Sequence, residues 1–169
     1  MISATLYAGM GGMGKGSIIQ KDGKYCVCAV AIESDPEVCA THRLNNPSIP
    51  VLCMHMTTHK QVLKTVQDYL PKRHWKRAWF HGSNSCKKAS TSNMQQRDLE
   101  AARADTVWAI AMLEKFRGAI WTLENVPTLH QFFKGKYATC YIFSMNKDCL
   151  LAQDRKRLII SNRPVFYPK

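Results

Sequence analysis

The sequence predicts an α/β fold, in which a mostly parallel sheet of seven strands carries helices on both faces and has an antiparallel last strand. Short apolar runs alternate with segments of helical periodicity, and this alternation is typical of parallel sheets. Residues 25–32 are apolar almost throughout, as expected of a strand that helices cover on both sides. The 169 residues suit one domain and can bury a full core, so we expect a single domain over residues 1–169.

The expected strands are short apolar runs, most of which end at glycine or polar residues. They cover residues 4–8, 25–32, 51–54, 78–81, 119–123, 137–143 and 158–161. Residues 36–44 form the first expected helix, because Pro36 suits a first turn and Asn46-Pro47 ends the segment. The other expected helices show apolar spacing of three and four and cover residues 62–70, 99–116 and 126–133.

The amino-acid composition indicates which kind of partner the protein binds and which cellular compartment it occupies. The 24 Lys and Arg residues against 12 Asp and Glu give a net charge of +12, which implies a polyanionic partner, most simply nucleic acid. A merely soluble basic protein is the alternative that charge alone leaves open. Seven irregularly spaced cysteines favour free thiols in an intracellular reducing compartment, nucleus or cytoplasm. We expect a soluble protein, since no apolar run approaches the roughly 20 residues that span a bilayer and residues 1–5 lack signal-peptide regions.

A glycine-rich loop follows the first expected strand and has three interpretations. Gly9, Gly11 and Gly14 satisfy the dinucleotide fingerprint, and Gly9, Gly14 and Lys15 nearly satisfy a P-loop. The P-loop fails because Gly16 stands where a Ser or Thr would hold magnesium. Glu33 ends the second strand and suits the ribose hydroxyls of NAD or of S-adenosylmethionine. A plain glycine turn is the third interpretation, and the glycines alone do not decide among them.

Two further patterns have ordinary structural explanations. Cys26-x-Cys28 with Cys39-x-x-His42 superficially resembles a zinc set, but the first pair lacks the two-residue spacing of a zinc knuckle, so we expect no metal. The four tryptophans are expected to pack in the core or on the sheet. Trp75 lies among lysines and arginines, so the alternative to core packing is that Trp75 contacts nucleic acid.

Five short motifs lie in order at the expected strand boundaries. They are Leu6-Tyr7-Ala8-Gly9-Met10-Gly11-Gly12, Glu33-Ser34-Asp35-Pro36, His81-Gly82-Ser83-Asn84-Ser85-Cys86-Lys87, Leu123-Glu124-Asn125-Val126 and Gln153-Asp154-Arg155-Lys156-Arg157. Together they resemble the motifs of the cytosine-C5 DNA methyltransferases, over nearly the whole chain. The resemblance implies one Rossmann-like domain that binds S-adenosylmethionine and methylates carbon 5 of cytosine in DNA. Because few residues follow the last motif, we expect no separate target-recognition domain in residues 1–169 and leave that role to a protein partner.

The resemblance also implies a role for each matched residue. Cys86 would be the nucleophile that adds to carbon 6 of cytosine, helped by positive charge from Lys87, Lys88 or Arg155. Glu124 would bind the ring near N3, and Asn125 would help hold the loop. Arg155, with Arg157 behind it, would steady the base carbonyl and the Glu124 carboxylate. The implied cofactor residues are Tyr7, Ala8, Gly9, Met10, Gly11, Gly12, Glu33, Ser34 and Ser83.

The sequence departs from the family at the nucleophile loop. Ser85 and Lys87 stand where the family has Pro and Gln, and no acidic residue follows the third strand at Cys53-Met54-His55. A catalytically silent subunit that binds cofactor or nucleic acid therefore stays open, as does a methyltransferase acting on tRNA cytosine. An NAD-dependent oxidoreductase would need a hydride-transfer acid or base that the sequence does not offer.

Overall fold

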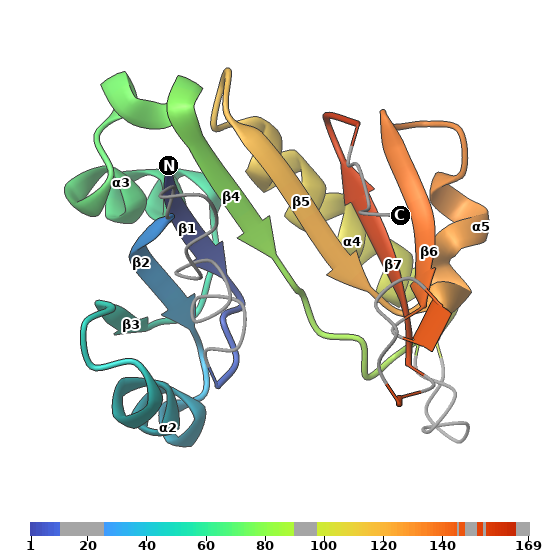
Figure 1. The fold of residues 1–169 in the computed structure, drawn as a ribbon, viewed down its shortest axis with the longest axis horizontal. Coiled ribbons are helices and arrows are strands. Elements are labelled where there is room, and N and C mark those ends of the chain that lie inside the picture. The colour runs from blue at the N-terminus through green and yellow to red at the C-terminus, as the bar shows by residue number, and fades with distance from the viewer. Residues whose placement is uncertain (11–25, 90–97, 145, 148–151, 154, 165–169) are drawn as a thin grey trace. The chain divides into compact units, whose positions relative to one another are not determined.

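The computed structural model describes residues 1–10, 26–89, 98–144, 146–147, 152–153 and 155–164 (Figure 1). Gly11 and Gly12 of the glycine-rich loop lie outside these residues. The chain forms two compact units, Met1–Ser83 with Ala111–Trp121, and Asn84–Ile110 with Thr122–Lys169. The expectation of one domain over residues 1–169 stays a prediction.

The first unit contains four parallel strands in the order β3-β2-β1-β4. Their bounds are β1 Ile2–Leu6, β2 Val27–Glu33, β3 Val51–Cys53 and β4 Ala78–Gly82. Leu6 lies opposite Ile32 on one side and Gly82 on the other, so the carboxyl ends of three strands meet at one edge. This edge is where ligands bind in parallel α/β sheets.

The helices of the first unit begin at side-chain caps. Asp35 Oδ1 accepts hydrogen bonds from the backbone N–H groups of Glu37 and Val38, at 2.9 and 3.2 Å, and so starts α2 (Pro36–Asn45). Thr58 caps α3 (His59–Tyr69) by accepting from Gln61 N at 3.2 Å. A 3₁₀ segment, η1 (Lys72–Arg77), then leads into β4.

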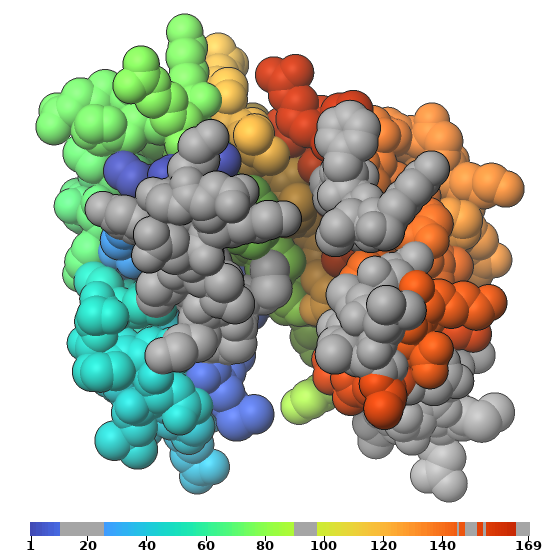
Figure 2. All heavy atoms as spheres, viewed as in Figure 1, coloured from blue at the N-terminus to red at the C-terminus, as the bar shows by residue number. Residues whose placement is uncertain are grey.

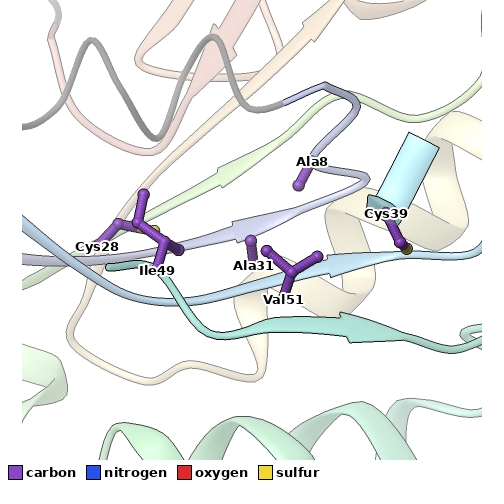
Figure 3. Packing of buried hydrophobic residues seen from close by; sticks show 6 residues of the cluster. All are labelled: Ala8, Cys28, Ala31, Cys39, Ile49 and Val51. Atoms are coloured by element: carbon purple, nitrogen blue, oxygen red, sulfur yellow. The ribbon is translucent and has the colours of Figure 1, made fainter. Parts of the chain in front are cut away.

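A small apolar cluster extends along β2, with Cys28 and Ile49 at one end and Ala8 and Cys39 at the other (Figure 3). It consists of Ala8, Cys28, Ala31, Cys39, Ile49 and Val51, all less than one-tenth exposed. These side chains come from the loop, from β2, from α2 and from the segment leading into β3. The packing therefore fixes the end of β1 against β2 and α2.

The second unit holds the antiparallel part of the fold, with the strand order β5-β7-β6. Its elements are α4 Leu99–Glu114, β5 Ile120–Asn125, η3 Pro127–Leu129, α5 His130–Phe133, β6 Thr139–Ser144 and β7 Lys156–Ser161; α4 and β5 each contribute residues to both units. The last strand, β7, pairs with both β5 and β6.

The predicted fold class is confirmed, because all seven strands form, the first four are parallel and the last strand is antiparallel. Element ends differ from the predictions by a few residues, and α4 ends at Glu114 rather than at residue 116. Among the residues that the structure describes, no helix has the length and apolar character needed to cross a membrane. The six described cysteines are free thiols, as predicted.

Acidification from pH 7 to pH 4 is expected to destabilise the protein through His81, which is buried on β4. Burial lowers the pKa of His81 from 6.5 to about 4. Unfolded chains take up this proton as the pH falls through 6.5, whereas the folded chain takes it up only near pH 4. The free energy of unfolding should therefore fall by up to roughly 3 kcal/mol across that interval and level off below it.

Urea unfolding at a series of pH values measures this effect. The His81→Gln variant should show a flatter pH dependence, while His55→Gln, at an exposed position, should keep the wild-type slope. An unchanged slope in His81→Gln would mean that other groups cause the acid sensitivity.

Candidate active site

The loop after β1 has an unusual backbone at two positions. Tyr7 and Gly9 have φ angles of +57° and +56°, and a left-handed conformation costs a non-glycine residue roughly 1–2 kcal/mol. Between them, Ala8 N donates to Ile32 O at 2.9 Å. A strained residue at the carboxyl end of a strand is a common feature of ligand-binding loops.

Glu33, at the end of β2, binds this loop through its side chain. Its Oε2 accepts a hydrogen bond from Gly9 N at 2.9 Å. Its Oε1 accepts from Ser34 N at 2.7 Å, from Ser34 Oγ at 3.2 Å and from Asp35 N at 3.2 Å. Oε2, with a second lone pair, can still accept a hydrogen bond from a ligand hydroxyl.

Helix α2 supports the same loop from the other side. The ring of His42 is buried and its Nδ1 lies 3.0 Å from Gly9 O, so Nδ1 is the nitrogen that carries the proton. Asn45 Nδ2 donates to Met10 O at 3.3 Å. Sequence analysis gave His42 and Asn45 no role at the site, although the three-residue spacing between them puts both on one face of α2.

Ser83 belongs to the same edge of the first unit. Its backbone N donates to Leu6 O at 3.2 Å, so Ser83 lies at the end of β1. Of the nine predicted cofactor residues, Tyr7, Ala8, Gly9, Met10, Glu33, Ser34 and Ser83 are described, and the contacts above gather them at the carboxyl ends of β1, β2 and β4.

The Cys86 loop in the second unit is held along its length. Ala89 N donates to Cys86 O at 2.9 Å and closes a turn. Ala89 is buried, and its carbonyl accepts the Thr128 hydroxyl at 2.9 Å. Lys88 Nζ forms an ion pair with Asp105 at 2.9 Å. The half-buried Cys86 side chain therefore projects from a fixed turn rather than from a loose surface loop.

A buried polar network joins this loop to the end of β5. Asn125 Nδ2 donates to Asn84 Oδ1 at 3.1 Å and to Thr106 Oγ1 at 3.4 Å, and Asn84 Nδ2 also donates to Thr106 Oγ1 at 3.4 Å. Thr106 in turn donates to Ala102 O at 2.8 Å, and Asn125 Oδ1 accepts from Val126 N at 2.8 Å. Asn125 thus contacts Asn84 of the Cys86 loop and Thr106 of α4, two partners that sequence analysis did not identify, and the role expected of Asn125 stays a prediction.

Of the two arginines expected at Glu124, Arg157 contacts its carboxylate, and the role expected of Arg155 stays a prediction. Arg157 Nε lies 2.6 Å from Glu124 Oε1, with about a quarter of each side chain exposed. Glu124 pairs with Ile159 across β5 and β7, and Arg157 is two residues from Ile159 on the same face. Arg155 lies before β7 begins, is exposed, and donates its backbone N to Gln153 O at 2.9 Å.

The cysteines of the zinc-like pattern have other roles. Burial raises the pKa of Cys28, and burial together with the nearby Cys53 raises the pKa of Cys39 to about 11, so both are thiols in the metal-free protein. His42 Nδ1 is engaged with Gly9 O. Among the described residues, no three metal-ligating side chains gather at one place.

The fold and the strand-end loops define a Rossmann-like α/β architecture. No protein-family model matches the sequence, and no curated protein matches it. Among solved structures, the Entamoeba histolytica methyltransferase EhMeth matches with a TM-score of 0.65 and 14% identity, covering 97% of this chain and 53% of its own. The S. pombe Dnmt2 methyltransferase matches with a TM-score of 0.56 and 16% identity, covering 100% and 50%.

A third similar structure is described as a DNA modification methyltransferase encoded within an E. coli prophage, with a TM-score of 0.58, 16% identity and coverage of 95% and 46%. The chain therefore spans about half the length of these structures. At this identity the comparison shows the shared fold, and it supports the family resemblance drawn from the five motifs.

Proposed function

We propose that the protein transfers a methyl group from S-adenosylmethionine to carbon 5 of cytosine in DNA, through a covalent adduct with Cys86. The observation that carries the proposal is the buried contact between Asn84 and Asn125, at 3.1 Å. Asn84 precedes Cys86 by two residues and Asn125 follows Glu124 directly. The contact thus joins the segment of the nucleophile to the segment of the carboxylate that would bind the base.

The edge of the first unit has the groups that the cofactor requires. Glu33 Oε2 has acceptor capacity for a ribose hydroxyl, and the Tyr7–Gly9 turn brings backbone groups to the end of β1. S-adenosylmethionine supplies an electrophilic methyl group on a sulfonium. In this proposal, the chain binds and orients the nucleoside portion of S-adenosylmethionine at the ends of β1 and β2.

The second unit has the groups that activate the base. The Cys86 thiolate would add to carbon 6 of cytosine, which makes carbon 5 nucleophilic towards the methyl group. Glu124 would share a proton with N3, where negative charge develops as the thiolate adds, and Arg157 would hold the Glu124 side chain in place. Loss of the carbon 5 proton to a base then breaks the bond between sulfur and carbon 6 and restores the thiolate. The target cytosine must leave the duplex for this chemistry.

Trapping on duplex DNA that contains 5-fluorocytosine tests the proposal. Fluorine on carbon 5 cannot leave as a proton does, so the adduct persists and is seen as a shifted band on a denaturing gel. We expect an adduct with the wild type and none with Cys86→Ser. Cys140→Ser, which changes another half-buried thiol of the same unit, should trap as well as the wild type. Equal trapping by Cys86→Ser would remove Cys86 from the mechanism.

A catalytically silent binding subunit is the second candidate. It is favoured by the Lys88–Asp105 ion pair, which neutralises a cation expected to promote the Cys86 thiolate. Binding of S-adenosylhomocysteine in a calorimeter, without any adduct on 5-fluorocytosine DNA, would select this candidate. Assays on duplex DNA and tRNA side by side decide between DNA and RNA as substrate.

A further inference from the structure

Six basic side chains form what we call the amino-edge cluster of the first unit. They are Lys72, Arg73, Lys76 and Arg77 of η1, and Lys115 and Arg117 of the turn before β5. All six are exposed. Figure 1 shows the turn before β5 beside η1 and the start of β4, and Figure 2 shows side chains of both segments standing out at the same end of this unit.

Aromatic packing fixes the two segments of the cluster against each other. Phe116 stacks on Phe80 with ring centroids 3.9 Å apart and contacts Trp75 edge to face at 5.0 Å. Trp75 Nε1 also donates to Leu70 O at 2.9 Å. The side chain of Lys76 lies beside Gly118, where a Cβ would come within 3.0 Å of Lys76 Cγ. The six cations are therefore displayed from a rigid base.

The amino-edge cluster is not neutralised by neighbouring carboxylates. Residues 68–77 and 111–121 contain two acidic side chains, Asp68 and Glu114. Neither forms an ion pair with the cluster, and none of the six cations pairs with a carboxylate among the residues that the structure describes. Six unneutralised like charges repel one another, and a bound polyanion would relieve this repulsion.

The cluster lies at the opposite edge of the parallel strands from the cofactor loop. η1 precedes β4, and Gly9 and Glu33 lie at the carboxyl ends of β1 and β2. β4 has five residues, which span about 16 Å at 3.3 Å per residue. The cluster is therefore a surface separate from the cofactor loop of the same unit.

We propose that the amino-edge cluster binds the phosphate backbone of duplex DNA as a second contact, separate from the cofactor loop. Single-stranded nucleic acid is less suited, because it needs exposed aromatic rings for stacking, and Trp75 and Phe116 are 4% and 1% exposed. The predicted alternative role of Trp75 as a nucleic-acid contact is thereby replaced by core packing. The choice of DNA over RNA rests on the proposed function; the phosphate-binding chemistry does not.

Salt-dependent binding of a short fluorescent duplex, without cofactor, tests this surface. We compare Arg77→Gln/Lys115→Gln/Arg117→Gln with the control Lys60→Gln/Lys134→Gln/Lys136→Gln, which removes three exposed cations elsewhere. Lys72 and Lys76 are left intact, because Lys72 Nζ lies 5.9 Å from the centre of the Trp75 ring and the stem of Lys76 adjoins Gly118. Between about 50 and 200 mM salt, the cluster variant should lower the slope of log affinity against log salt by about 2 to 3, and weaken binding roughly tenfold to a hundredfold.

The control variant should change the slope by less than about 1, since its cations contact no phosphate in the proposed complex. Equal losses in both variants, or an unchanged slope in the cluster variant, would overturn the proposal. Duplex RNA bound more tightly than duplex DNA through the same residues would overturn the choice of DNA. The binding measurement needs no methyl transfer. If the wild type binds DNA through the cluster but forms no adduct on 5-fluorocytosine DNA, the proposed function is refuted and the proposal for the cluster is not.

Discussion

Arg157→Gln is expected to lower the rate of methyl transfer by about 10² or more, and to lower it at least tenfold more than Arg155→Gln does. Arg157 is the arginine on the Glu124 carboxylate, at 2.6 Å, and both side chains are about three-quarters buried. Without the guanidinium, the carboxylate loses the group that fixes its orientation towards the base. Arg155 is exposed and lies outside β7, so its loss should disturb Glu124 less.

Single-turnover transfer of a labelled methyl group to duplex DNA is the measurement. Lys156→Gln removes an exposed cation between the two arginines and serves as the control for net charge. A larger loss in Arg155→Gln than in Arg157→Gln would show that the structural pairing is not the functional one. Thermal unfolding of each variant separates loss of activity from loss of folding.

Asn125→Leu is expected to lower the free energy of unfolding by roughly 2–5 kcal/mol and to prevent adduct formation by Cys86. The substitution removes the donor to Asn84 Oδ1 and the acceptor for Val126 N, both in a buried place. Each buried polar group left without a partner costs roughly 1–3 kcal/mol. The Cys86 loop also loses its contact with the end of β5.

A matched pair at Thr106 isolates the network from simple packing. Thr106→Ser keeps the hydroxyl and should cost about 1 kcal/mol for the lost methyl group. Thr106→Val keeps the shape but removes the acceptor that both asparagine amides use, at 3.4 Å each, and should cost more and reduce trapping on 5-fluorocytosine DNA. If Thr106→Val traps as well as Thr106→Ser, the network does not position Cys86.

The fold could be predicted because each element carries its own local signal. Pro36 and the Asp35 cap start a helix, and alternating apolar runs give the strands, whatever their partners. The candidate residue Cys86 follows a strand, Glu33 and Glu124 lie at the carboxyl ends of strands, and these positions need no knowledge of register. Sequence alone therefore reached the segments that make up the site.

The pairing of side chains could not be predicted in the same way. Whether Arg155 or Arg157 faces Glu124 depends on the β5–β7 register, which two segments more than 30 residues apart decide together. The Asn84–Thr106–Asn125 network likewise joins three distant segments. Thr106 did carry a signal, because it interrupts an otherwise apolar helix face, and a polar residue buried there needs a partner.

The Glu33 carboxylate has a bearing on how ligand affinities in this protein are interpreted. The Glu33 carboxylate hydrogen-bonds to Gly9 and to the Ser34-Asp35 turn. Glu33→Ala would therefore destabilise the loop even in the protein without ligand. A lower affinity of this mutant for a nucleoside would then reflect the altered loop structure as much as the loss of a direct contact with the ligand. The melting temperature of the mutant without ligand measures the structural contribution. Its affinity for S-adenosylhomocysteine, compared with that melting temperature, then shows how much of the loss is due to recognition.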